Sequence, residues 1–306
     1  MIRLTLWGQD KTYDSMPSFN QKLTFTMLKN EFLNMGEDIK ITLDVLKTLN
    51  LYQKEAFNIA ALLISDENDL ETSEIDMVKF KSGTSIIEDR KTIKKCSIIN
   101  QFNEANIFFN KHCSPVEVLE KIRRVKKTPI PLVAFREALA NAIVHRDYLI
   151  KGTIQVAYYD NRIEIISWGG LVKDMSEEAF YNDNLSILRN PIVAQVFRRL
   201  GLIEAFGTGV RKIIKSYEET QFRPAFVIED KYIKVVLPNI YFDDSKFKEE
   251  EKIINYLQIN QKITRIEVEK ILNVSRDKAY SILNKMVKNQ KISLIEQGPS
   301  SFYEMK

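Results

Sequence analysis

Arg136 to Tyr148 read REALANAIVHRDY, and this stretch is the most informative part of the chain. If the stretch is helical, Glu137, Asn141 and His145 lie at positions i, i+4 and i+8 and share one stripe. These three groups suit a metal-bound phosphate, because a carboxylate holds or deprotonates a water, an amide oxygen ligates Mg²⁺ and an imidazole reaches an anion. The alternative is a solvated helix face.

The composition is that of an ordinary globular protein of 306 residues, with 44% hydrophobic and 28% charged residues and a net charge of +4. This length predicts two or three domains. No apolar run approaches the ~20 residues that cross a bilayer, and the N-terminus lacks a signal-peptide pattern. Cys96 and Cys113 have no paired spacing, which fits a reducing cytoplasm and excludes a four-cysteine zinc module. We therefore expect a cytoplasmic protein with no membrane partner.

Hydrophobic periodicity predicts an α+β chain in three regions: a mixed α/β region at 1–115, a central domain at 116–240 and a helical C-terminal domain at 246–306. A basic stretch at 121–127 is interpreted as a solvated helix face, with DNA contact as the alternative. Alternating residues and a tight turn at Asp160-Asn161 predict a hairpin. The elements expected in the central domain are a hairpin at 153–159 and 162–167, helices at 191–200 and 210–217, and a second hairpin at 225–228 and 232–237.

Glycine is concentrated in the central region, where six of the ten glycines lie between Gly152 and Gly209. Gly207 and Gly209 flank Thr208 directly before a predicted helix. A helix N-terminus exposes unpaired N–H groups, and glycine allows close approach of an anion, so this turn is a candidate phosphate cradle. The turn is not a P-loop, because no Gly-Lys-Ser/Thr follows.

In combination, these motifs resemble the GHKL superfamily of gyrase, heat-shock chaperone, histidine kinase and mismatch-repair ATPases. Glu137 and Asn141 match its N-box, and the turn at 207–209 matches its second glycine box. The resemblance implies ATP and Mg²⁺ as cofactors, with Asn141 on the metal, Glu137 positioning the attacking water and the glycine amides on the phosphates. The nucleotide-binding residues implied in this way are Asn141, His145, Ser167, Gly169, Gly170, Arg189, Asn190, Gly207, Thr208 and Gly209.

One motif departs from the superfamily. The first glycine box has the pattern D-x-G-x-G, whose Asp binds the adenine amino group, but this chain has Ser167-Trp168-Gly169-Gly170. Ser167 offers one hydrogen bond and no carboxylate. The departure leaves adenine selectivity open, and a fold that binds no nucleotide and serves as a dimer scaffold stays an alternative.

Residues 129–217 resemble more closely the C-terminal region of a prokaryotic group labelled as transcriptional regulators or helicase-related proteins. That region is classed as a divergent GHKL-type ATPase domain, and "LRNP" and "GLIE" belong to its signature. Full-length members begin with an Alba-like or Schlafen-like DNA-binding domain. We expect this chain to start after most of that domain, as a truncated or shortened member.

Residues 246–306 are similar to a winged helix-turn-helix, with Thr264 and Ser275 as predicted helix caps. A small helical interaction or dimerisation module is the alternative. The region holds twelve Lys and Arg against eight Asp and Glu, which favours double-stranded DNA as a partner. In the predicted recognition helix, Arg and Asn suit base edges and Lys suits phosphates. The candidate DNA-binding residues are Arg276, Lys278, Tyr280, Asn284, Lys285, Lys288 and Lys291.

Three functions follow from these patterns. The first is a homodimeric DNA-binding regulator whose central domain binds a Mg-nucleotide or another small anionic ligand, which alters DNA binding. The second is a slow ATPase that acts on DNA. The third is the nucleotide-free scaffold.

Overall fold

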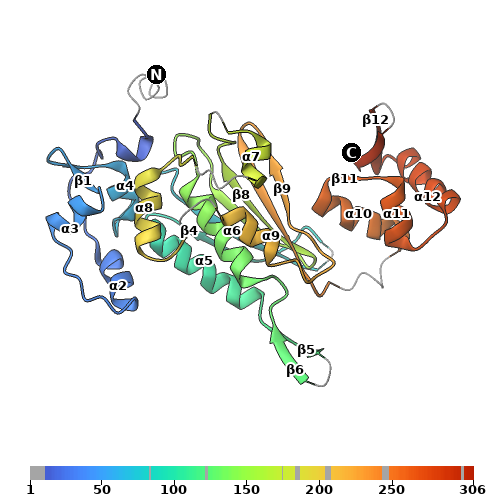
Figure 1. Ribbon diagram of the computed structural model, residues 1–306, viewed down its shortest axis with the longest axis horizontal. Helices are drawn as coiled ribbons and strands as arrows, with labels where there is room; N and C mark the ends of the chain where they lie inside the picture. The colour runs from blue at the N-terminus through green and yellow to red at the C-terminus, as the bar shows by residue number, and fades with distance from the viewer. Residues whose placement is uncertain are drawn as a thin grey trace. The chain divides into compact units, whose positions relative to one another are not determined.

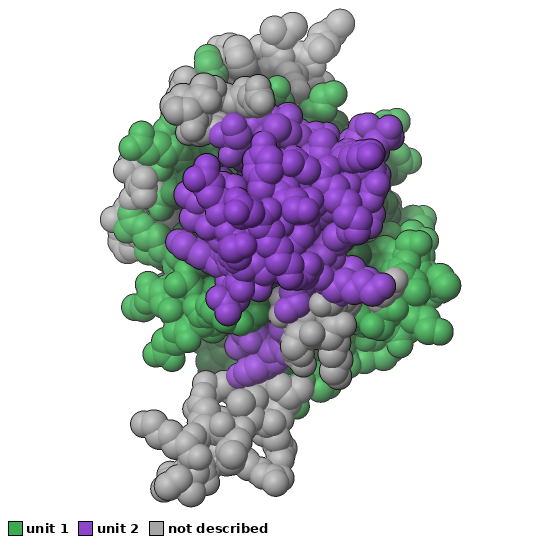
Figure 2. All heavy atoms as spheres, turned by 90° about the vertical axis from the view of Figure 1, so that its right-hand side faces the viewer, with its two compact units in different colours: residues 1–237 green, residues 238–306 purple. Residues whose placement is uncertain are grey.

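The computed structural model describes residues 11–82, 84–120, 123–173, 175–182, 187–203, 208–242, 248–297 and 300–306. The chain forms two compact units, residues 1–237 and residues 238–306, which are coloured separately in Figure 2. Each unit has its own buried apolar core, and both mix helices with strands. The predicted α+β class is therefore confirmed.

A six-stranded mixed sheet forms the centre of the first unit, in the order β4-β3-β7-β8-β10-β9. β3 runs parallel to β7, whereas β3 with β4, β7 with β8, and β9 with β10 are antiparallel pairs. Both predicted hairpins are present, and Tyr158 pairs with Ile163 across the first turn. The strands are β3 (Ile75–Phe80), β4 (Ile87–Ile93), β7 (Ile154–Tyr158), β8 (Arg162–Trp168), β9 (Ala225–Ile228) and β10 (Tyr232–Pro238).

Helices α5 (Ile98–His112), α6 (Leu132–Val144) and α9 (Gly209–Lys215) pack along the sheet, as Figure 1 shows. α5 contacts β3, and α6 contacts both β8 and α9. Phe109 of α5 stacks on Phe135 of α6 with ring centroids 4.2 Å apart. Burial of these aromatic rings on apolar strand residues removes apolar surface from water, which drives this layer to form.

The remaining elements before α5 form a small, mainly helical part of the first unit, in which η1 and α4 contact α8 (Pro191–Arg199). Asp14 joins the two parts, because its buried carboxylate accepts hydrogen bonds from the backbone N–H groups of Ile192 (2.8 Å) and Val193 (3.2 Å). An acidic side chain at these unpaired amides caps α8. The elements are η1 (Tyr13–Ser15), α2 (Thr26–Asn34), α3 (Leu43–Thr48), β1 (Tyr52–Gln53), β2 (Ala56–Phe57) and α4 (Ile59–Ile64).

The boundary expected at residue 115 does not separate two compact units. β3 and β4 precede this residue and pair within the same sheet as β7 to β10, which follow it. The first unit instead extends to Leu237. Sequence periodicity is local, so it gave no sign of the parallel pairing between β3 and β7, which joins residues about 80 positions apart.

The basic stretch is not a helix, and its interpretation as a solvated helix face is wrong. The chain forms a two-stranded hairpin of β5 (Val116–Glu120) and β6 (Arg123–Lys127), in which Val118 pairs with Val125. β-branched residues at alternating positions favour extended backbone, and this preference outweighs the helix propensity of the charged residues. Residues 121 and 122 lie outside the described ranges.

The second unit has the element order helix, strand, helix, helix, hairpin. Its sheet has the order β11-β13-β12, and β11 is an addition to the predicted pattern. Thr264 accepts a hydrogen bond from the Glu267 N–H and Ser275 from the Lys278 N–H, which confirms both predicted caps. The elements are α10 (Glu249–Asn260), β11 (Lys262–Ile263), α11 (Arg265–Leu272), α12 (Arg276–Lys288), β12 (Ile292–Gln297) and β13 (Ser300–Met305).

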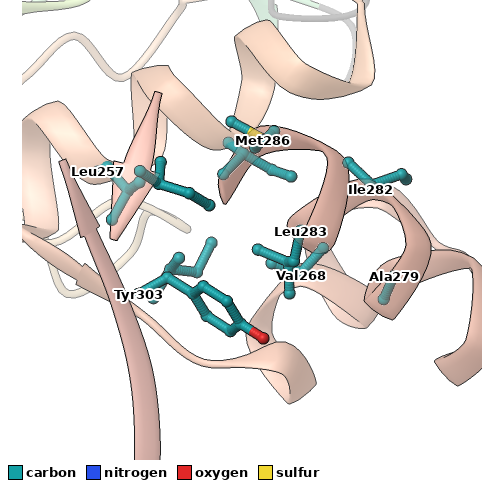
Figure 3. Close-up of a cluster of buried hydrophobic side chains, with 10 residues drawn as sticks. Leu257, Val268, Ala279, Ile282, Leu283, Met286 and Tyr303 are labelled. Atoms are coloured by element: carbon teal, nitrogen blue, oxygen red, sulfur yellow. The ribbon is translucent and has the colours of Figure 1, made fainter. Parts of the chain in front are cut away.

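The core of this unit comes from all three helices and the hairpin. Figure 3 shows Leu257, Val268, Leu283 and Met286 directed toward one another, with the Tyr303 ring from β13 beside them. The spacing of the α12 residues in this core leaves the opposite side of the helix to solvent. The predicted turn at Gly298-Pro299 lies outside the described residues.

Candidate functional site

A cavity of about 350 Å³ lies in the first unit, bounded by residues of α6, β8, β10 and α9. Its volume is within the range of small-molecule and cofactor pockets. Most of the residues predicted to bind a ligand line this one cavity, although they come from separate parts of the chain. The predicted residues that line it are Glu137, Asn141, His145, Ser167, Gly169, Gly170, Arg189, Thr208 and Gly209.

The polar stripe of α6 forms one wall. Glu137 and Asn141 are half-buried, one helical turn apart, and the Asn141 Nδ2 donates to Glu137 Oε1 at 3.4 Å. Because the amide nitrogen of Asn141 faces the Glu137 carboxylate, the amide oxygen of Asn141 is directed away from Glu137. The helix is shorter at its end than predicted, since α6 stops at Val144 and His145 is the C-cap. His145 nevertheless lines the cavity.

The His145 side chain in this wall of the cavity is uncharged. Burial, and secondarily the Arg189 guanidinium, lower the pKa of His145 to about 4. The imidazole is therefore neutral near pH 7 and offers one donor and one acceptor nitrogen, without a positive charge for an anion.

Gly209 lies against the acid–amide pair. A Cβ at this position would lie 2.7 Å from Asn141 Nδ2 and would also collide with Glu137 Oε1. Thr208 is the N-cap of α9 and its side chain makes no capping hydrogen bond. A larger residue at position 209 would therefore displace the ends of the Glu137 and Asn141 side chains. Gly207, the other predicted glycine of this turn, lies outside the described residues.

The glycine pair after β8 is held by backbone contacts. Gly169 has φ +107°, a conformation that favours glycine, and its N–H donates to Lys231 O at 2.7 Å. A Cβ at Gly170 would lie 2.6 Å from the backbone oxygen of Asp230. Both glycines are thus required by close packing in this wall of the cavity.

Ser167 is the residue at which the resemblance to the GHKL superfamily would place an aspartate. Its hydroxyl is buried and donates to the Ala142 carbonyl of α6 at 2.6 Å. The hydroxyl proton is thereby used within the protein, and the oxygen keeps lone pairs that can only accept from a ligand.

Arg189 and Asn190 have different environments although they are adjacent. Arg189 lines the cavity, donates from Nη2 to Gly170 O at 2.7 Å and lies 3.3 Å from Asp147 Oδ2. Asn190 does not line the cavity, because its buried amide donates to the carbonyls of Val144 and Arg146 at 2.8 Å each. The Asn190 side chain therefore fixes the C-terminal end of α6 through these two hydrogen bonds.

Sequence reasoning missed two parts of the cavity. One is an apolar wall that includes Met175, Phe180 and Phe226, and the other is Arg198 at the end of α8. The stretch after Gly170 reads LVKDMSEEAF, and its scattered hydrophobic residues form no pattern that predicts the apolar wall. No motif distinguishes Arg198 from Arg199.

In the second unit, the candidate DNA-binding residues divide into two groups. Three lysines form ion pairs with the first turn of α10: Lys278 with Glu249, and Lys285 (2.8 Å) and Lys291 (2.7 Å) with Glu250. The two lysines lower the pKa of Glu250 to about 2. The other candidates are exposed on α12 without an ion pair among the described residues: Arg276, Tyr280, Asn284 and Lys288.

Comparisons with known proteins support an ATPase-type domain in the first unit. Residues 152–237 match a family described as "Putative ATP-dependent DNA helicase recG C-terminal". The match covers less than half of the chain, and it begins after α6, so it includes the two glycine motifs but not Glu137, Asn141 or His145. No curated protein matches the chain.

The fold is also similar to a solved structure, the crystal structure of the DIP2311 protein from Corynebacterium diphtheriae. The TM-score is 0.67 at 17% sequence identity, and the match covers 99% of this chain and 66% of that chain. At this identity the likeness shows the fold alone. The chain spans just under two thirds of the length of this relative.

None of the helices in the described ranges is both long and apolar enough to cross a membrane. Within the same ranges, no cluster of three or more His, Cys, Asp and Glu side chains is arranged to hold a metal ion.

Proposed function

We propose that the cavity of the first unit binds a nucleotide together with Mg²⁺. The observation that carries this proposal is the convergence of Glu137, Asn141 and Gly209, from α6 and from the start of α9, on one cavity with an apolar wall. A polar end for phosphates and an apolar end for a base are the two environments that a nucleotide requires. The ATPase-type family match to residues 152–237 supports the same assignment.

The side chains present fit a Mg²⁺ that arrives with its ligand. Mg²⁺ keeps several waters and is commonly held by one or two protein oxygens together with phosphate oxygens. The cavity supplies one amide oxygen, from Asn141, and a carboxylate one helical turn away. Bound Mg²⁺ would neutralise phosphate charge and fix the position of the phosphate chain.

The protein groups then have separate roles. Asn141 would hold the metal. Glu137 would orient a water and accept its proton as the water attacks the terminal phosphorus, and the bond to the bridging oxygen would break so that the nucleoside diphosphate leaves. Neutral His145 donates one hydrogen bond to a phosphate oxygen. Ser167 accepts a hydrogen bond from an amino group of the base, because its own proton is used by Ala142. Without the Glu137 step, the same site acts as a nucleotide sensor.

The second unit binds double-stranded DNA as a winged helix-turn-helix. Its element order and the exposed Arg276, Tyr280, Asn284 and Lys288 on α12 support this role, because Arg and Asn recognise base edges in the major groove. A single module of this kind binds weakly, so specific recognition requires a homodimer. Nucleotide binding in the first unit changes the affinity for DNA, which makes the protein a regulator.

Thermal unfolding with Mg-ATP, Mg-ADP and no ligand tests the nucleotide proposal. Ligand at 100 times its Kd stabilises the folded state by ~2.7 kcal/mol. We expect such a shift in the wild type and its loss in Asn141→Ala. Asn110→Ala is the control, because Asn110 is exposed on α5 and does not line the cavity.

The outcomes separate the candidate functions. A shift with phosphate release that Glu137→Ala abolishes supports an ATPase, whereas a shift without release supports a sensor. Equal melting temperatures with and without either nucleotide would leave only the scaffold. For DNA, we expect Arg276→Ala with Lys288→Ala to weaken binding and to reduce its dependence on salt.

A further inference from the structure

Two arginines end helix α8, and their surroundings differ. Arg199 forms a two-point ion pair with Glu37, with Nη1 3.1 Å from Oε1, and its guanidinium lies 5.1 Å from the centre of the Phe32 ring. Arg198 lines the cavity instead. Its side chain is exposed and makes no hydrogen bond or ion pair with any described residue. The guanidinium of Arg199 is therefore already paired with a carboxylate, whereas that of Arg198 is available to a ligand in the cavity.

The cavity needs a positive charge if it is to hold a polyanion. Glu137 faces the cavity and repels phosphate, and His145 is neutral because its pKa is lowered to about 4. Among the described residues of the lining, the cationic side chains are Arg189 and Arg198. Arg189 already donates to Gly170 O and lies beside Asp147. Its charge is largely offset within the protein, so Arg198 is the guanidinium best able to pair with a ligand.

The fold positions Arg198 well for this purpose. The preceding residues of α8, Val193, Ala194, Val196 and Phe197, are buried with at most a trace of exposed surface, so the backbone that carries Arg198 is fixed. The long side chain can then extend while its backbone stays in place. A guanidinium also presents a planar fork of N–H donors that matches two phosphate oxygens at once, which lysine does not.

We propose that Arg198 binds the terminal phosphates of the ligand and makes the site selective for nucleoside di- and triphosphates over nucleosides. This inference rests on the proposed nucleotide site and adds the residue that recognises the charge of the ligand. Arg198 is thus a specificity residue, contributed to the cavity lining by the last turn of α8. A charge-assisted pair of this kind strengthens binding by about 10- to 100-fold.

A ligand series tests the assignment. Binding of adenosine, AMP, ADP and ATP with Mg²⁺ is measured by titration calorimetry on the wild type, Arg198→Ala, Arg198→Lys and Arg199→Ala. We expect Arg198→Ala to weaken ATP and ADP binding about 10- to 100-fold, to leave adenosine binding unchanged, and Arg198→Lys to recover part of the loss. Arg199→Ala, the matched control, should bind all four ligands like the wild type. Equal ATP affinity in Arg198→Ala and Arg199→Ala would refute the role.

A second measurement does not depend on nucleotide binding. The wild-type protein is treated with phenylglyoxal, which modifies arginine, with and without inorganic tripolyphosphate, and the modified residues are identified by mass spectrometry. We expect tripolyphosphate to slow modification of Arg198 several-fold and to leave Arg199 unchanged. Protection without binding of any nucleotide would overturn the proposed nucleotide while retaining the anion site. No protection of Arg198 would overturn the inference itself.

Discussion

Substitution of Gly209 by alanine tests the geometry of the cavity with a single added carbon. The new Cβ would lie 2.7 Å from Asn141 Nδ2 and would collide with Glu137 Oε1. Ordinary contact begins at 3.4 Å, so the Asn141 amide has to move by about 0.7 Å. A displacement of this size at a reacting or metal-binding group reduces function by up to about 100-fold.

The two effects of this variant have opposite signs. Without ligand, alanine in a helical position restricts the unfolded chain and stabilises the protein by roughly 0.4–1 kcal/mol, less any strain in moving the side chains. With ligand at 100 times the wild-type Kd, a 10- to 100-fold loss of affinity lowers the stabilisation from ~2.7 to about 0.4–1.4 kcal/mol. Urea unfolding with and without Mg-ATP measures both quantities.

Gly36→Ala is the control for this experiment. Gly36 has φ +82° and no atom within 4 Å of an added Cβ, so the variant is destabilised by about 1 kcal/mol through its backbone and keeps its ligand response. If Gly209→Ala is stabilised by Mg-ATP as fully as the wild type, contact between the start of α9 and the acid–amide pair has no part in binding the nucleotide.

Three further predictions follow. Glu250→Gln removes the ion pairs of Lys285 and Lys291, so DNA affinity measured by fluorescence anisotropy should rise and should depend more steeply on salt. Unchanged affinity would show that these lysines do not contact DNA. Because the pKa of His145 is lowered from 6.5 to about 4, the unfolded state binds the proton first, and folding stability should fall as pH falls from 6.5 to 4. The slope should be smaller in His145→Gln, and identical urea-unfolding profiles for the two proteins would contradict the shifted pKa. Asp14→Ala removes the cap of α8 and should cost about 0.5–2 kcal/mol in the same unfolding assay, and a cost near zero would mean that water replaces the carboxylate.

Local patterns predicted the elements well where the physical cause is local. The hairpin of β7 and β8 follows from alternating residues and the Asp160-Asn161 turn, and the capped helices of the second unit follow from Thr264 and Ser275. The end of α6 at Val144 could not be predicted from the hydrophobic pattern. The residues that follow Val144 form hydrogen bonds with parts of the chain that are distant in sequence. The Asp147 N–H, for example, donates to Trp168 O at 2.8 Å.

The candidate site was only partly accessible from the sequence. Motif spacing located the side chains of α6 and the glycine turns, because each lies within a short stretch of chain. Two residues could not be assigned in this way. Asn190 belongs to a motif but is buried and hydrogen-bonded to the end of α6, whereas Arg198 belongs to no motif and lines the cavity. Likewise, the pairing of Lys278 with Glu249 joins two helices that local spacing cannot relate.

The most direct measurement is a crystal structure of the protein grown with Mg²⁺ and a non-hydrolysable ATP analogue. We expect electron density for the analogue inside the cavity, with a metal ion beside the Asn141 amide oxygen and the terminal phosphate near Arg198. Density for the analogue elsewhere on the protein, or a cavity filled by the protein's own side chains at saturating analogue, would contradict it.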